Sequence, residues 1–167
     1  MISLDNIKDV LNPSYLLNKT FMEEKREGMK IDIIYSGGYI LFQSDKKSAK
    51  YLDFFHPSLV GGGIRRTADY IIITTKNNTI HCIIVELKKA NDNPKEQLSL
   101  TEFFVDFMFK RICYKYKQHS NVVIRKVGAF KDKIPNGYKG LTKPGKLYDS
   151  ANFAYIKGNK FDLGRYL

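Results

Sequence analysis

The stretch RRTADYIIITTKNNTIHCIIVELKKA, residues 65–90, predicts the centre of the fold. Two apolar runs rich in β-branched residues, 69–75 and 79–89, flank the turn Lys76-Asn77-Asn78. Because Asn tolerates the left-handed backbone that tight hairpin turns need, the segment predicts an antiparallel β-hairpin. Both strands carry charges near one end, although a buried charge costs free energy unless it is paired, solvated or bound to a metal.

These charges are expected to gather at one end of the hairpin. Side chains alternate between the faces of a strand, so Glu86 and Lys88 share one face. Centring the turn on Asn77 places Asp69 about opposite residue 85, within one residue of Glu86. Two carboxylates and one ammonium group would then converge, unless these residues are simply solvated strand ends.

Such a convergence has a chemical use. Two neighbouring carboxylates supply the oxygen ligands that a hard divalent cation such as Mg²⁺ prefers. The ion polarises a phosphate and lowers the pKa of a bound water, while a nearby Lys can orient the water or stabilise developing negative charge. Asp69 and Glu86 are therefore candidate metal ligands, the backbone carbonyl of Leu87 is a further candidate, and Lys88 is a candidate catalytic residue.

The rest of the chain predicts helices around a mixed β-sheet. Asn93, Pro94 and Glu96 form a helix-start pattern with Asn93 as the cap. The helices are expected over 14–27 and 94–117, and the remaining strands within 30–43, over 121–130 and around 152–158. The apolar side of the second helix is expected to consist of Leu100, Phe104, Phe107, Met108 and Ile112. This order predicts a single α/β domain over residues 1–167.

The hairpin residues resemble a known family. Asp69, sixteen intervening residues and then Glu86-Leu87-Lys88 is similar to the motif of the PD-(D/E)XK nuclease superfamily, although Ala68 stands where the motif name has Pro. An acid-x-Lys tripeptide occurs three times, but only this copy ends an apolar strand and leads into a capped helix. The resemblance implies a restriction endonuclease-like αβββαβ core, which the predicted order matches over about 14–130, followed by a basic extension, 131–167.

The resemblance also implies an activity. It implies a Mg²⁺- or Mn²⁺-dependent nuclease that hydrolyses phosphodiester bonds, and more specifically a DNA endonuclease. Small nucleases of this kind often form homodimers, so a homodimer is also expected. In it, Asp69 and Glu86 bind the metal and Lys88 assists the attacking water.

Two further positions follow from the resemblance. Family members often add an acid from the first helix, for which Glu23 and the adjacent Glu24 are candidates. RecB-like members carry a Gln on the helix after the motif, and Gln97 lies in that region, whereas position 101 is Thr where those members usually have Tyr.

Positive charge is concentrated toward the C-terminus. The formal net charge is +11, yet residues 1–109 contain 14 basic and 14 acidic residues, whereas 110–167 contain 14 basic and three acidic ones. This segregation favours a nucleic acid as partner, although a lysine-rich composition is the other reading. Candidate phosphate-binding residues are Arg65, Arg66, Lys110, Arg111, Lys115 and Lys117. The alternative for Arg65 and Arg66 is that they lie in a solvated loop and bind nothing.

Other features limit the class of protein. No apolar run approaches the roughly 20 residues that span a bilayer, and the start MISLDNIKDVL has no apolar signal region, which predicts an intracellular protein that is not secreted. Cys82 and Cys113 are expected to be reduced core residues. A non-catalytic nucleic-acid-binding protein and a basic protein-interaction module remain the alternatives to a nuclease.

Overall fold

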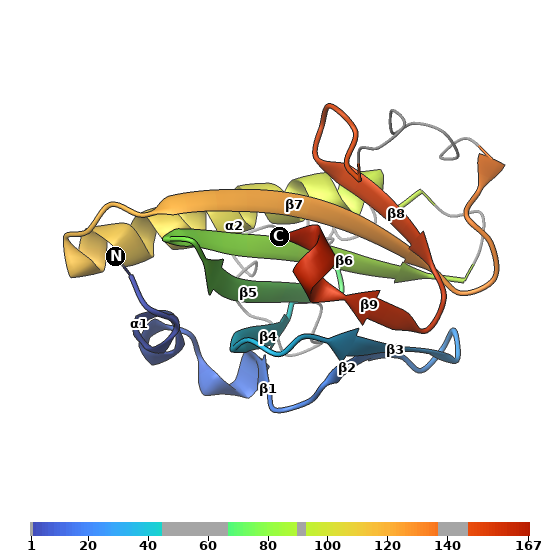
Figure 1. Cartoon of the computed structure of the whole chain (residues 1–167), viewed down its shortest axis with the longest axis horizontal. Helices are drawn as coiled ribbons and strands as arrows, with labels where there is room; N and C mark the ends of the chain where they lie inside the picture. Colours follow the sequence, from blue (N-terminus) through green and yellow to red (C-terminus); the bar gives the residue numbers. More distant parts are fainter. Residues whose placement is uncertain (1, 45–66, 90–92, 137–146) are drawn as a thin grey trace, which may run out of the picture.

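The main element of the computed structural model is a mixed β-sheet (Figure 1). The structure describes residues 2–44, 67–89, 93–136 and 147–167. Within these ranges the sheet has six strands in the order β1-β4-β5-β6-β7-β8. The strands are β1 (Leu16–Leu17), β4 (Tyr39–Gln43), β5 (Tyr70–Lys76), β6 (Thr79–Lys88), β7 (Asn121–Phe130) and β8 (Phe153–Lys157). Neighbours from β1 to β6 pair antiparallel, whereas β7 is parallel to β6 and β8 is parallel to β7.

A smaller sheet and a set of helices complete the described part of the chain. The smaller sheet has the order β2-β3-β9, with β2 (Phe21–Glu24), β3 (Met29–Ile34) and β9 (Lys160–Asp162). The α-helices are α1 (Leu4–Val10) and α2 (Lys95–Tyr116), and the 3-10 helices are η1 (Pro13–Tyr15) and η4 (Leu163–Tyr166). The predicted α/β class is therefore confirmed. No helix in the described ranges is long and apolar enough to cross a membrane.

The central hairpin forms as the sequence predicts. Lys76 pairs with Thr79, so Asn77 and Asn78 make a two-residue turn with φ values of 49° and 58°. Both values lie in the left-handed region, which suits the twist of a hairpin and which Asn adopts more readily than most residues.

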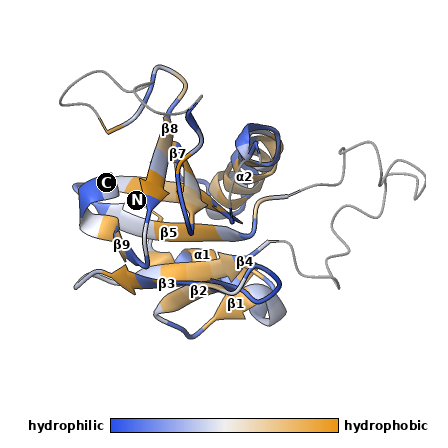
Figure 2. Cartoon of the chain, turned by 90° about the vertical axis from the view of Figure 1, so that its right-hand side faces the viewer, coloured by the Kyte–Doolittle hydropathy of each residue, from blue (hydrophilic) through white to orange (hydrophobic). Residues whose placement is uncertain are grey.

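Strands β5 and β6 are buried on both faces. On one face Ile71, Cys82 and Ile84 join a core that α1 and α2 cover; on the other Ile72 and Ile83 join a core with the smaller sheet. Figure 2 shows α2 on one side of the large sheet and β9 on the other. Cys82 is buried and unoxidised, as predicted, and burial raises the pKa of its thiol. Because the middle of each strand is sealed on both sides, polar side chains can reach a ligand only near the strand ends.

Helix α2 connects β6 to the parallel strand β7, and both elements are confirmed. The helix begins at Lys95, and its N-cap residue is Pro94 and not the predicted Asn93, although the Lys95 N–H donates to the side chain of Asn93 at 3.0 Å. Its buried stripe consists of Leu98, Thr101, Val105, Phe109 and Ile112. The predicted apolar side is therefore largely wrong: of its residues only Ile112 belongs to this stripe, and Phe107 is 61% exposed. The helix is rotated so that the polar Thr101 meets the sheet, which hydrophobic spacing alone does not predict.

The predicted helix over 14–27 is wrong. These residues form η1, β1 and β2, and Met22 is fully buried between the sheets while β2 pairs with β3. The first helix is instead α1. Ser3 and Asn6 form a reciprocal capping box at its N-terminus. The strands expected within 30–43 and around 152–158 are present as β3, β4 and β8, but β3 and β4 belong to different sheets.

The turn can be tested by its backbone conformation. We expect Asn78→Val to lower the free energy of unfolding by about 1–2 kcal/mol, the cost of a left-handed conformation for a residue with a bulky Cβ. Urea unfolding followed by circular dichroism measures it. The matched variant Asn78→Gly, which adopts positive φ at no steric cost, should not be destabilised; equal losses in both variants would contradict the turn geometry.

Candidate functional site

Two carboxylates meet at the end of the hairpin opposite the turn. The β5–β6 register, in which Tyr70 faces Val85, brings Asp69 opposite Glu86. The Asp69 N–H donates to Oε2 of Glu86 at 3.1 Å, and the Leu87 N–H donates to Oδ2 of Asp69 at 2.6 Å. Asp69 is 8% exposed and Glu86 is 2% exposed, so both acids are buried. The sequence had placed Asp69 within one residue of this position.

Lys88 lies on the same face as Glu86 and contacts it. Its Nζ is 2.8 Å from Oε1 of Glu86 and donates to Oε1 of Gln97 at 3.0 Å. The ion pair and the backbone donor offset the desolvation of the Glu86 carboxylate, which would otherwise be costly at this depth. Gln97 comes from the first turn of α2, and its Nε2 donates to the Thr67 carbonyl at 3.4 Å. The structure therefore brings together Asp69, Glu86, Lys88 and Gln97.

Two polar side chains fix the backbone just before β5. The Ala68 N–H donates to Oγ1 of Thr101 at 2.7 Å, and the same hydroxyl donates to the Gln97 carbonyl at 2.7 Å. On the other side, the Ser44 hydroxyl donates to the Ala68 carbonyl and the Ser44 N–H donates to the Asp69 carbonyl. Thr101 and Ser44 are both fully buried. Neither residue is predicted by the sequence pattern alone; the one available signal is a Thr among the apolar positions of α2.

The sheet beyond Glu86 forms an apolar wall. Glu86 lies next to Gly128 in β7, and Gly128 lies next to Tyr155 in β8. A Cβ at Gly128 would lie 3.0 Å from Cγ of Pro94 and 3.1 Å from Cδ1 of Tyr155. Pro94 and the Tyr155 ring thus occupy the space beside the carboxylates that a side chain at position 128 would need.

A buried cation lies one row further along the sheet. Lys126 in β7 faces Ile84 in the register, is 5% exposed and pairs with Glu102 of α2. Its Nζ also lies 4.5 Å from the ring centroid of Phe153. This ion pair could not be predicted from the sequence, because β7 shows no pattern that separates a buried Lys from a solvated one.

The structure does not bring the candidate third acid to this cluster. Glu23 lies on β2, which packs on the Tyr70 side of the large sheet, and pairs with Lys19 at 2.9 Å. That hydrogen bond lowers the pKa of Glu23. The Glu24 carboxylate accepts the Arg26 N–H. Among the described residues no three His, Cys, Asp or Glu side chains are grouped as metal ligands. The displacement of Glu23 follows directly from its being in a strand and not in a helix.

The candidate phosphate-binding cations of α2 lie far from the carboxylates. At about 1.5 Å per residue, Lys110 is about 20 Å and Lys117 about 30 Å along the axis from Gln97. Lys110, Arg111, Lys115 and Lys117 therefore belong to a separate surface at the C-terminal half of α2. Arg65 and Arg66 fall outside the described residues.

Comparison with known proteins adds nothing to this geometry. No protein-family model, curated protein or solved structure matches the chain significantly. The residues at the hairpin end are therefore the basis for inferring a function. They define a buried carboxylate pair joined to a Lys–Gln pair, an arrangement that can hold a cation and place positive charge beside it.

The role of Thr101 can be tested by removing its hydroxyl. Thr101→Val keeps the shape but leaves the buried Ala68 N–H without this acceptor, so we expect the free energy of unfolding to fall by about 1–3 kcal/mol. Urea titration measures the change. Thr101→Ser, which keeps the hydroxyl, should lose clearly less; if both variants behave alike, the hydroxyl does not hold the strand.

Proposed function

We propose that this chain is a metal-dependent nuclease of the PD-(D/E)XK type with a restriction endonuclease-like core. The observation that carries the proposal is the meeting of Asp69, Glu86 and Lys88 at one hairpin end. The element order is compatible with it once the two-residue strand β1 and the smaller-sheet strands β2 and β3 are set aside: α1 is then followed by β4, β5, β6, α2 and β7. The first helix covers Leu4–Val10 and not the expected 14–27, and the acids fall at the second and third of these remaining strands.

The donor atoms suit a hard cation. Carboxylate and carbonyl oxygens are the ligands that Mg²⁺ and Mn²⁺ take. The Leu87 N–H points to Asp69, and the N–H and C=O of one strand residue leave the strand on the same side, so the Leu87 carbonyl also points to that side. Asp69, Glu86 and this carbonyl would hold the ion. When bound, it supplies Lewis acidity toward a phosphate oxygen and a lower pKa for water.

The chain's own residues account for the rest of the chemistry. Hydrolysis joins a water oxygen to phosphorus and breaks the bond from phosphorus to the leaving ester oxygen, which takes up a proton. Negative charge develops on the phosphate oxygens as this happens. The Lys88 ammonium, held between Glu86 and Gln97, provides fixed positive charge beside the reacting group, and burial strengthens its effect. The excess positive charge of residues 110–167 favours a nucleic acid as the substrate.

The proposal predicts metal-dependent cleavage that needs Glu86. Plasmid, single-stranded DNA, branched DNA and RNA would be incubated with Mg²⁺ or Mn²⁺ and with EDTA. In Glu86→Gln, which keeps the volume of the side chain, we expect the cleavage rate to fall by more than about 100-fold, since even outer partners of a metal cost 10- to 100-fold. The matched control is Glu102→Gln, an acid that also pairs with a Lys but lies outside the hairpin.

A second readout does not depend on turnover. A ligand that binds the folded state raises the unfolding temperature, so Mg²⁺ should raise it for wild type and for Glu102→Gln but not for Glu86→Gln. Cleavage that persists in Glu86→Gln would show that the assignment of Glu86 is wrong. Tight, salt-sensitive DNA binding with neither cleavage nor a Mg²⁺ effect would replace the nuclease by a non-catalytic nucleic-acid-binding protein.

A further inference from the structure

The outer face of α2 combines exposed aromatic rings with positive charge. Among the described residues, Ile34, Phe103, Phe107 and Tyr114 are the exposed large hydrophobic residues, and the last three belong to α2. Phe103 is 73%, Phe107 61% and Tyr114 84% exposed. With 3.6 residues per turn, the three rings fall within an arc of about 40° and extend over about 16 Å along the axis. We call them the aromatic stripe.

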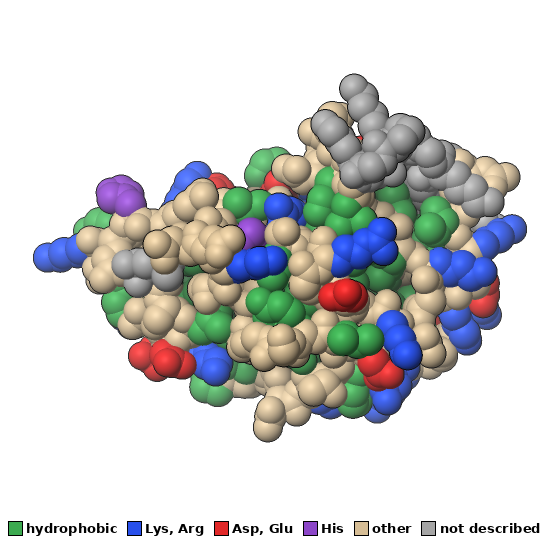
Figure 3. All heavy atoms as spheres, viewed as in Figure 1, with side chains coloured by type: hydrophobic (Ala, Val, Ile, Leu, Met, Phe, Trp, Pro, Cys, Tyr) green, Lys and Arg blue, Asp and Glu red, His purple; other side chains and the backbone are tan. Residues whose placement is uncertain are grey.

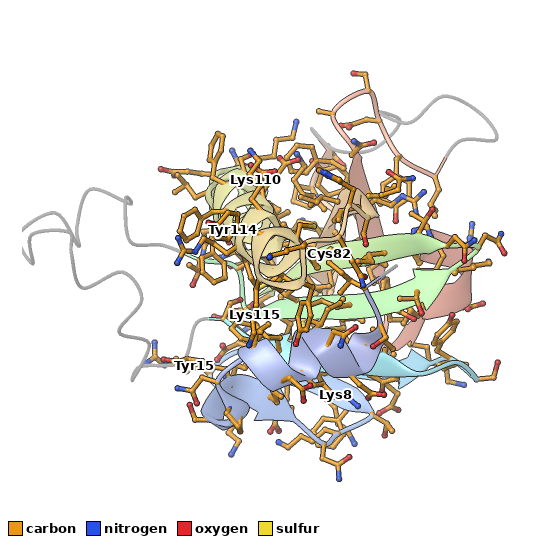
Figure 4. The ribbon with its side chains drawn as sticks, turned by 90° about the vertical axis from the view of Figure 1, so that its left-hand side faces the viewer. Lys8, Tyr15, Cys82, Lys110, Tyr114 and Lys115 are labelled. Atoms are coloured by element: carbon orange, nitrogen blue, oxygen red, sulfur yellow. The ribbon has the colours of Figure 1, made fainter. Side chains whose placement is uncertain are left out.

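Cations flank the C-terminal part of the aromatic stripe, whereas Glu102 and Asp106 lie near Phe103 in the sequence. Residues 107–119 include Lys110, Arg111, Lys115 and Lys117 and no acid. Figure 4 looks along α2 from its C-terminal end and places Tyr114 on the side away from Cys82 and the sheet, with Lys110 and Lys115 on either side of it. Of these cations, Lys110 pairs with Asp106 at 2.6 Å.

A hollow adjoins the stripe. A groove of about 890 Å³ between α2 and the start of β7 is lined by Tyr114, Lys115, Lys117, His119 and Val122, among others. The opposite face of the molecule differs, because there Lys and Arg side chains are interspersed with Asp and Glu (Figure 3). Rings, cations and a concave surface thus occur together at the C-terminal half of α2.

We propose that the outer face of α2 binds single-stranded nucleic acid, with bases stacked on Phe103, Phe107 and Tyr114 and the backbone phosphates held by the flanking cations. Aromatic rings accept any base by stacking, and a positively charged groove follows the phosphate backbone. A duplex offers only phosphates to this face, since its bases are already stacked. A second copy of the chain would bring like charges together, which opposes self-association through this face. The proposed surface lies away from the carboxylates and does not require them to act.

The test uses the absence of tryptophan from the chain. Phe107→Trp introduces a single tryptophan on the stripe, and stacking of a base quenches its fluorescence. Titration with oligo(dT) in EDTA excludes cleavage, so the outcome is separate from the nuclease proposal. We expect saturable quenching by oligo(dT) and weaker binding of duplex DNA. Binding seen by anisotropy of a labelled oligonucleotide without quenching would overturn the proposal.

Substitution of the rings gives an independent test. In Phe103→Ala/Phe107→Ala/Tyr114→Ala, oligo(dT) affinity should fall by at least about 10-fold, since each stacked base contributes measurably to binding. Phe103→Tyr/Phe107→Tyr keeps the rings and should bind like wild type, as should Ile34→Ala, which removes an exposed apolar side chain from β3. Unfolding curves confirm that each variant is folded. Unchanged affinity in the triple alanine variant, or no binding by wild type, would show that the stripe is not a stacking surface.

Discussion

The register between β5 and β6 is the constraint on which the rest of the structure depends. The Asn77-Asn78 turn fixes it at one end, and the bonds between Asp69 and the β6 residues Glu86 and Leu87 fix it at the other. Side chains alternate with a period of two, so a slip of one residue would move each apolar set to the opposite core. Such a slip would disrupt the packing of both cores. It would also move Asp69 away from its position opposite Glu86.

Burial of the carboxylates at the end of the hairpin is tolerable because three neighbouring elements contribute polar groups. Ser44 follows β4, Lys88 ends β6, and Gln97 and Thr101 come from the first turns of α2. Polar groups left unpaired at this depth would be costly, whereas a connected network rigidifies the segment it holds. The position of the Asp69 backbone is therefore set by three elements, β4, β6 and α2, and not by β5 alone.

Local sequence patterns predict the parts of the fold that short-range interactions control. The hairpin, α2 and β7 follow from turn residues, a helix start and an apolar run, and the hairpin count placed Asp69 within one residue of Glu86. The helix prediction for 14–27 failed because the apolar spacing of this stretch fits a helix and a strand equally well. Pairing of β2 with β3 selects the strand. The position of Glu23 was lost with that helix. Likewise, hydrophobicity alone could not tell that Thr101 faces inward while Phe107 faces outward.

The wide range of sequence separations in the large sheet has a consequence for how the chain assembles. Strands β5 and β6 are joined by a two-residue turn, whereas Thr79 pairs with Asn121 only after α2 has crossed between them. Short loops close quickly and parallel pairings slowly, because the entropy of the long loop must be lost first. We therefore expect the two acids to meet early, while Gln97 and Thr101 join them only when the helix docks. A nascent chain would thus carry its acidic pair before the residues that restrain it.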